Sequence, residues 1–179
     1  MTTWVALLGA VNVGARRVKM SRLVELFAAA GAVDPVTHVQ SGNVVFDHEL
    51  GDAEALTGEL ETALATGCGF DVPVFLRTGD ELAAVVAACP FDEDDPKRLS
   101  AVFLAAEPDA EAVATVAELA VPGEAIAVDG TTAYLHLPFG TGRSKLAAGV
   151  RKLGVAGTAR NWRSVTTLRD LALARAGSG

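Results

Sequence analysis

The chain has 179 residues, half of them hydrophobic, and a formal net charge of −7 at pH 7. This composition allows a substantial core, in one domain or two small ones. Every long apolar stretch is broken by Gly, Pro or a charge before the roughly 20 residues that a membrane span requires, so we expect no membrane association.

The first 90 residues predict elements in the order β-α-β-β-α-β-α. The strands are expected at 4–8, 36–40, 43–47 and 71–77, and the helices at 21–30, 52–65 and 80–88. Asp52 is expected to cap the second helix and Gly67 to end it. Residues 40–43, QSGN, are expected to form the turn of a hairpin, to which Asn43 is suited.

Residues 99–179 predict the same order after an acidic linker, FDEDDPKR. The strands are expected at 100–105, 124–128, 132–137 and 155–159, and the helices at 108–119, 144–152 and 162–174. The repeated order predicts an α+β fold of two tandem ferredoxin-like subdomains, an internal duplication with an N-terminal subdomain at 1–90, a linker at 91–98 and a C-terminal subdomain at 99–179. The strands at 4–8 and 100–105 are apolar without alternation, so each is expected to be central in its sheet.

Charge is unevenly distributed along the chain. Residues 46–130 hold 19 of the 22 acidic residues, whereas residues 131–179 hold eight of the 15 Lys and Arg residues and a single acid. A local basic surface can attract an anion even on an acidic protein, so the net charge does not exclude an anionic ligand.

Two loops of the first half hold polar residues that a turn alone does not require. GAVNVGARRVKM, residues 9–20, places Arg16, Arg17 and Lys19 beside glycines and the start of a helix, where an anion is favoured. In QSGN, Gln40 is the residue that a turn does not need. The structural alternatives are a solvated basic surface for the first loop and a plain hairpin turn for the second.

Two further loops of this kind lie in the second half. PFGTGRSKL, residues 138–146, brings Ser144 to a helix start between Arg143 and Lys145, which fits either an anion site or an ordinary N-cap. In GTARNW, residues 157–162, Asn161 is expected to cap the last helix and Trp162 to bury its ring. Arg160 is expected on the open side, where it binds an anion or pins a neighbouring loop.

The sequence contains no recognisable catalytic set. His38, His48 and His136 are scattered without metal-ligand spacing, and Cys68 and Cys89 lack a CxxC spacing. We therefore expect no metal and no cofactor, and two reduced thiols. The apolar run near the start precedes the first basic residues, the reverse of the order in a signal peptide, so we expect a cytoplasmic protein.

Four segments together, ALLGAVNVGARRVKM, HVQSGNVVF, RSKL and GTARNWRSVTTL, resemble the family of domain of unknown function 1697 (DUF1697). The resemblance covers nearly the whole chain and implies a two-subdomain α+β fold with no established activity. It places Asn12, Gly14, Gln40, Ser41, Gly42, Asn43, Ser144, Lys145, Arg160, Asn161 and Trp162 on the family's motif positions. After the Trp, the family pattern has Asn-Thr where this chain has Arg163-Ser164.

Three functions fit these observations. The first is binding of a phosphorylated small molecule or a nucleic acid by the basic and Gly-rich loops. The second is an enzyme acting on such a ligand, with Ser41, Ser144, Lys145 or Arg160 assisting by electrostatics. The third is a structural or protein-interaction module, and the oligomeric state is left open. The candidate ligand-binding residues are Asn12, Gly14, Arg16, Arg17, Lys19, Gln40, Ser41, Asn43, Arg143, Ser144, Lys145, Arg160, Asn161 and Trp162.

Overall fold

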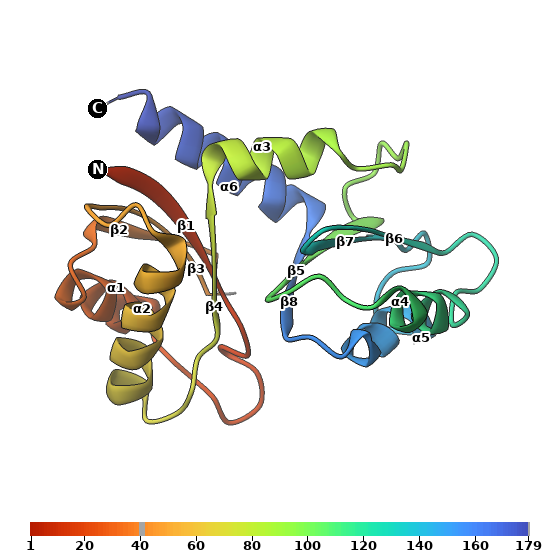
Figure 1. The fold of residues 1–179 in the computed structure, drawn as a ribbon, viewed down its shortest axis with the longest axis horizontal. Coiled ribbons are helices and arrows are strands. Elements are labelled where there is room, and N and C mark those ends of the chain that lie inside the picture. The colour runs from red at the N-terminus through yellow and green to blue at the C-terminus, as the bar shows by residue number, and fades with distance from the viewer. Residues whose placement is uncertain (40–41, 179) are drawn as a thin grey trace. The chain divides into compact units, whose positions relative to one another are not determined.

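The computed structural model describes residues 1–39 and 42–178 (Figure 1). These residues form a mixed α/β fold with two four-stranded antiparallel sheets and six α-helices. Their contacts divide the chain into two compact units, one of Met1–Ala83 with the chain from Thr167 onward and one of Ala84–Thr166. Within the described ranges, no helix combines the length and the apolar character that crossing a membrane requires.

The sheet of the first unit has the strand order β2-β3-β1-β4, and all its pairs are antiparallel. β1 is therefore central, as its apolar sequence predicts, and residues 4–8 are buried. Helices α1 and α2 lie against one face of this sheet (Figure 1), where Leu23, Phe27 and Leu60 pack against Trp4 and Phe46. The elements are β1 (Thr2–Leu8), α1 (Met20–Ala29), β2 (Val33–His38), β3 (Asn43–His48), α2 (Ala53–Cys68) and β4 (Val74–Thr78).

The two ends of α2 differ in how far local sequence determines them. Asp52 caps the helix as predicted, because its Oδ1 accepts hydrogen bonds from the amides of Glu54 (2.9 Å) and Ala55 (3.1 Å). The prediction that Gly67 ends the helix is wrong, since α2 continues to Cys68 and ends at Gly69, whose φ is +78°. Gly67 instead lies against the side chain of Leu26, where a Cβ would collide.

The sheet of the second unit has the order β6-β7-β5-β8, again antiparallel throughout and with its first strand central. Val102 and Leu135 of the sheet pack against Leu146 of α5. The predicted helix at 144–152 is split into α5 and a 3-10 helix, with Gly149 at the junction against Leu119. The elements are β5 (Leu99–Leu104), α4 (Ala110–Ala117), β6 (Ala125–Asp129), β7 (Thr132–His136), α5 (Lys145–Gly149), the 3-10 helix η1 (Val150–Leu153) and β8 (Gly157–Asn161).

Two helices, α3 (Gly79–Ala87) and α6 (Trp162–Ala176), contribute residues to both units. Each begins directly after the strand that precedes it and continues past the boundary of its unit. The contact units therefore divide the chain at other positions than the predicted linker at 91–98. That residues 1–90 and 99–179 are separate folding units stays a prediction.

Candidate functional site

A polar cavity of about 420 Å³ lies at one end of the second sheet. Its wall comes from the segment before β5, the start of β5, the loop after β7 and the junction of β8 with α6. The lining residues are Pro96, Lys97, Ser100, Gly140, Thr141, Asn161 and Arg163. Two of the four loops singled out in the sequence, 138–146 and 157–162, thus meet at one place.

The strand register brings these segments together. Ser100 on β5 is the partner of Asn161 on β8, and the neighbouring Leu99 is the partner of His136 on β7. Because all three strands are antiparallel neighbours, the start of β5, the end of β8 and the loop that follows β7 share one end of the sheet.

Asn161 caps α6 as predicted. It is the last residue of β8, and its Oδ1 accepts a hydrogen bond from the amide of Ser164 at 2.8 Å. No loop separates strand from helix, so Arg163 stands in the first turn of α6 and faces the cavity. The positive end of the helix dipole adds to the charge of Arg163 at this position.

The cavity carries two exposed cations, Lys97 and Arg163, neither of which forms an ion pair with another described residue. Arg98, the neighbour of Lys97, lies 3.6 Å from Glu93 and 3.7 Å from Asp95. The acidic segment 91–98 therefore neutralises Arg98 and leaves the charge of Lys97 at the cavity.

The basic residues of PFGTGRSKL do not line this cavity. Ser144 is buried, and its Oγ accepts from the amide of Ala147 at 3.0 Å, so it acts as the N-cap of α5. Arg143 and Lys145 are exposed on either side of it. From this loop only Gly140 and Thr141 reach the cavity.

The prediction that Arg160 lies on the open side is wrong, because this residue is only 7% exposed. Residues alternate along β8, so Thr158 and Arg160 share the buried side while Ala159 and Asn161 are exposed. The Arg160 guanidinium donates to Thr158 Oγ1 (2.7 Å) and to the Ala159 carbonyl (2.9 Å). Burial lowers the pKa of Arg160 to about 10.

Trp162 is half-buried, and its ring meets the edge of Tyr134 on β7, with centroids 6.3 Å apart and an interplanar angle of 62°. This contact anchors the start of α6 to the sheet, in the manner expected of the Trp.

The other two predicted loops meet at one end of the first sheet, since the Leu8 amide donates to the Gly42 carbonyl at 2.8 Å. In the loop after β1, Asn12 has φ +58°, and its Oδ1 accepts from the Val18 amide at 3.0 Å. Gly14 has φ +60°, which favours glycine. Arg16, Arg17 and Lys19 are exposed, and the Arg16 guanidinium lies 5.5 Å from the centroid of the Phe70 ring.

Asn43 belongs to β3 rather than to a turn. It is fully buried, and its Nδ2 donates to the His38 carbonyl at 3.1 Å, which joins the two strands of the hairpin. Gln40 and Ser41, also predicted as ligand-binding residues, lie outside the described residues.

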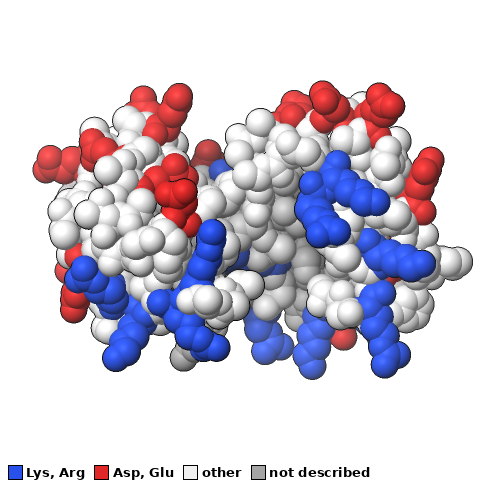
Figure 2. All heavy atoms as spheres, turned by 90° about the horizontal axis from the view of Figure 1, so that it is seen from below, with Lys and Arg blue, Asp and Glu red and all other residues white. Residues whose placement is uncertain are grey.

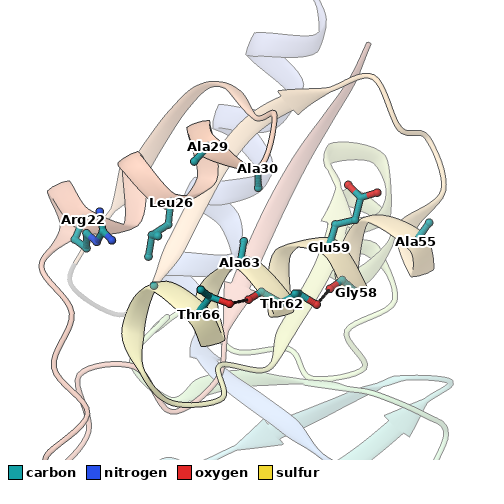
Figure 3. Close-up of a pocket in the computed structure, with 11 residues that line it drawn as sticks. Arg22, Leu26, Ala29, Ala30, Ala55, Gly58, Glu59, Thr62, Ala63 and Thr66 are labelled. Atoms are coloured by element: carbon teal, nitrogen blue, oxygen red, sulfur yellow. Dashed lines mark hydrogen bonds between the residues drawn. The ribbon is translucent and has the colours of Figure 1, made fainter.

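A larger cavity of about 820 Å³ lies in the first unit between α1 and α2 (Figure 3). Most of its lining side chains are small, and Arg22 and Glu59 are its charged members. The Thr62 and Thr66 hydroxyls are bonded to carbonyls one turn earlier, at 2.8 and 2.9 Å. This cavity contains none of the residues predicted as ligand-binding.

Charge separates along the molecular surface. On the face drawn in Figure 2, the Lys and Arg side chains of each unit gather toward one side, and the Asp and Glu side chains toward the other. The described residues contain no group of three His, Cys, Asp or Glu side chains arranged to hold a metal ion.

Sequence reasoning missed Lys97, Ser100, Thr141 and Arg163 as a set. Lys97 belongs to a segment interpreted as a linker, and Ser100 to a strand start. Arg163 could have been found from its position two residues after the capping Asn161, within the basic last part of the chain.

A family model described as "Protein of unknown function (DUF1697)" matches residues 1–134 of the chain. The matched region ends before most of the residues that line the polar cavity. No curated protein matches the chain. Among solved structures, the conserved bacterial protein SP0830 from Streptococcus pneumoniae is similar at 21% identity, with a TM-score of 0.75 over 96% of this chain and 98% of that chain. At this identity the similarity establishes the fold alone.

Proposed function

We propose that this chain, which belongs to the DUF1697 family of proteins of unknown function, binds a small phosphorylated molecule in the polar cavity of its second unit. One observation carries the proposal: Lys97 and Arg163 come from distant parts of the sequence to one cavity, and neither has an ion-pair partner among the described residues. A phosphate group accepts charge-assisted hydrogen bonds from such cations.

The size and the polar groups of the cavity support a small ligand. About 420 Å³ lies within the roughly 300–1,000 Å³ of small-molecule sites. The hydroxyls of Ser100 and Thr141 and the carboxamide of Asn161 add neutral hydrogen-bonding groups to the two cations. The net charge of −7 disfavours the alternative, sequence-independent binding of a nucleic acid, which depends on many phosphate contacts.

The lining favours binding over catalysis. Among the described residues that line the cavity, none has a carboxylate, imidazole or thiol that could act as a general base. An enzyme at this site would rely chiefly on electrostatic stabilisation by Lys97 and Arg163.

The test is a thermal-shift screen with inorganic phosphate, sugar phosphates, nucleotides and short oligonucleotides, followed by calorimetric titration of each hit. A ligand at 100 times its dissociation constant adds about 2.7 kcal/mol to the free energy of unfolding. We expect Lys97→Ala and Arg163→Ala each to weaken binding about 10-fold to 100-fold, the usual effect of losing a hydrogen bond to a charged group.

Arg151→Ala is the matched control, because Arg151 is exposed on η1 and does not line the cavity. It should bind like the natural protein. If all three variants weaken binding equally, the loss comes from the change in net charge, and the assignment of the ligand to the cavity is refuted. Turnover of a bound phosphate ester would favour the enzyme alternative.

We also propose that the two units are duplicated ferredoxin-like folds. The shared strand order supports this, and so does a second cavity of about 290 Å³ at the matching place in the first unit. There Thr78 ends β4 and caps α3, exchanging hydrogen bonds with Glu81 (2.7 and 3.2 Å), much as Asn161 ends β8 and caps α6. This cavity is lined by Asp80 and by no Lys or Arg among the described residues, so no anion is expected in it.

A further inference from the structure

His136 on β7 contacts the segment that carries Lys97. His136 Nε2 lies 3.0 Å from Glu93 Oε2, and the ring of Phe91 is stacked on the imidazole at 5.7 Å and 28°. The side chains of His136 and Glu93 are both largely buried, with 23% of His136 and 13% of Glu93 exposed. The contact therefore joins the acidic segment to the sheet rather than lying free in solvent.

A continuous chain of hydrogen bonds leads from this contact to Lys97. Glu93 Oε1 accepts from the Asp95 amide at 3.0 Å, and Asp95 Oδ1 accepts from the Lys97 amide at 3.0 Å. The Leu137 amide donates to the Arg98 carbonyl at 2.6 Å, which fixes the far end of the segment. Lys97 is therefore linked through Asp95 to Glu93 on one side and through Arg98 to Leu137 on the other.

The charged groups around His136 define the electrostatics of the contact. Glu93 contacts the imidazole directly, and Arg98 forms ion pairs with Glu93 and Asp95. Glu124 is the neighbour of Ala125, which is the register partner of His136 on β6. The hydrogen bond from His136 and that from the Asp95 backbone hold the pKa of Glu93 below its ordinary value. Glu93 is therefore an anion near neutral pH, and protonation of the imidazole strengthens the pair.

We infer that His136 is a positioning residue for the anion cavity, and that its contact with Glu93 sets the place of Lys97 and makes anion affinity depend on pH. The inference rests on the proposed phosphate-binding function. A protonated imidazole donates a charge-assisted hydrogen bond to the Glu93 carboxylate, so protonation tightens the contact and favours the bound geometry.

The experiment measures sulfate binding by calorimetry between about pH 5 and 8, the range in which histidine side chains in general change charge. Sulfate is used because its charge stays constant there, whereas phosphate titrates. We expect the natural protein to bind sulfate about twofold to fivefold more tightly at the acidic end, the scale of a partly exposed ion pair. His136→Asn and Glu93→Gln should each make the sulfate affinity nearly independent of pH, at the weaker value that the natural protein has at the alkaline end. Glu93→Gln keeps the size of the side chain, so it provides the result if His136→Asn fails to fold.

The outcomes separate the two ideas. If Arg163→Ala abolishes sulfate binding but His136→Asn and Glu93→Gln keep the natural pH profile, the positioning role is overturned and the cavity stands. If the natural protein binds no sulfate or phosphate, both fail. A purely structural role of His136 predicts lower thermal stability in its variant with an unchanged pH profile of binding.

Discussion

Tyr134 offers a sharp test of the packing at the start of α6, because it is the single tyrosine of the chain. It is 2% exposed, its hydroxyl donates to the Val85 carbonyl at 2.9 Å, and its ring meets Trp162. Burial, with smaller contributions from Asp129 and Cys89, raises the pKa of Tyr134 to about 12.

Because folding raises the pKa of Tyr134, the free energy of unfolding decreases at high pH. A tyrosine in the unfolded chain has a pKa of about 10, so the neutral hydroxyl stabilises the fold fully below that pH. The contribution is lost as the pH rises from about 10 to 12. A two-unit difference corresponds to about 2.7 kcal/mol, which is the largest loss that this group can cause.

Two measurements check the prediction. The absorbance of tyrosinate in the native protein reports Tyr134 directly, and its midpoint should lie near 12. Denaturant unfolding of the natural protein and of Tyr134→Phe should show a stability difference of about 1 kcal/mol at neutral pH, from the lost hydrogen bond. That difference should shrink and then reverse above about pH 10, because the phenylalanine cannot ionise. Subtracting the variant removes other groups that titrate in this range, among them Arg160.

A native titration midpoint near 10 would refute the reasoning, since it would mean that water reaches the hydroxyl. So would a stability difference that is constant with pH.

Two further predictions concern helix positions. Gly67→Ala should destabilise the protein by about 1–3 kcal/mol through collision with Leu26, whereas Gly58→Ala on the same helix meets nothing within 4 Å and should stabilise by up to about 1 kcal/mol. Denaturant midpoints test the pair, and equal effects would contradict the packing of α1 on α2. Asn161→Ala should lower stability by about 1 kcal/mol, because the Ser164 amide loses its partner, and an unchanged melting temperature would argue against the cap.

Local features of the fold were readable from the sequence. Asp52, Ser144 and Asn161 each accept from an amide two or three residues later, so their capping roles need no knowledge of distant contacts. The apolar runs at 4–8 and 100–105 likewise predicted two buried strands, which lie centrally in their sheets. A strand whose two faces are both covered has no solvent side on which polar residues would alternate.

Predictions failed where a residue's surroundings come from another element. A glycine after an apolar helical pattern usually marks the end of a helix, yet Gly67 lies inside α2. A glycine is needed there because Leu26 of α1 occupies the space of a side chain. Arg160 was expected in the open, since charge favours exposure. Side chains alternate between the buried and the exposed face of β8, and the pairing of β8 with β5 decides that Arg160 lies on the buried face.

The sequence by itself determined the order of the elements, the central strands and the helix caps, since each depends on residues within a few positions of one another. Only the tertiary structure decided that Lys97, Ser100, Asn161 and Arg163 surround one cavity. Their meeting depends on the register of β5 with β8 and β7. Register is fixed by the packing of whole strands, between residues about 60 positions apart for β8 and about 40 for β7, which no local pattern records.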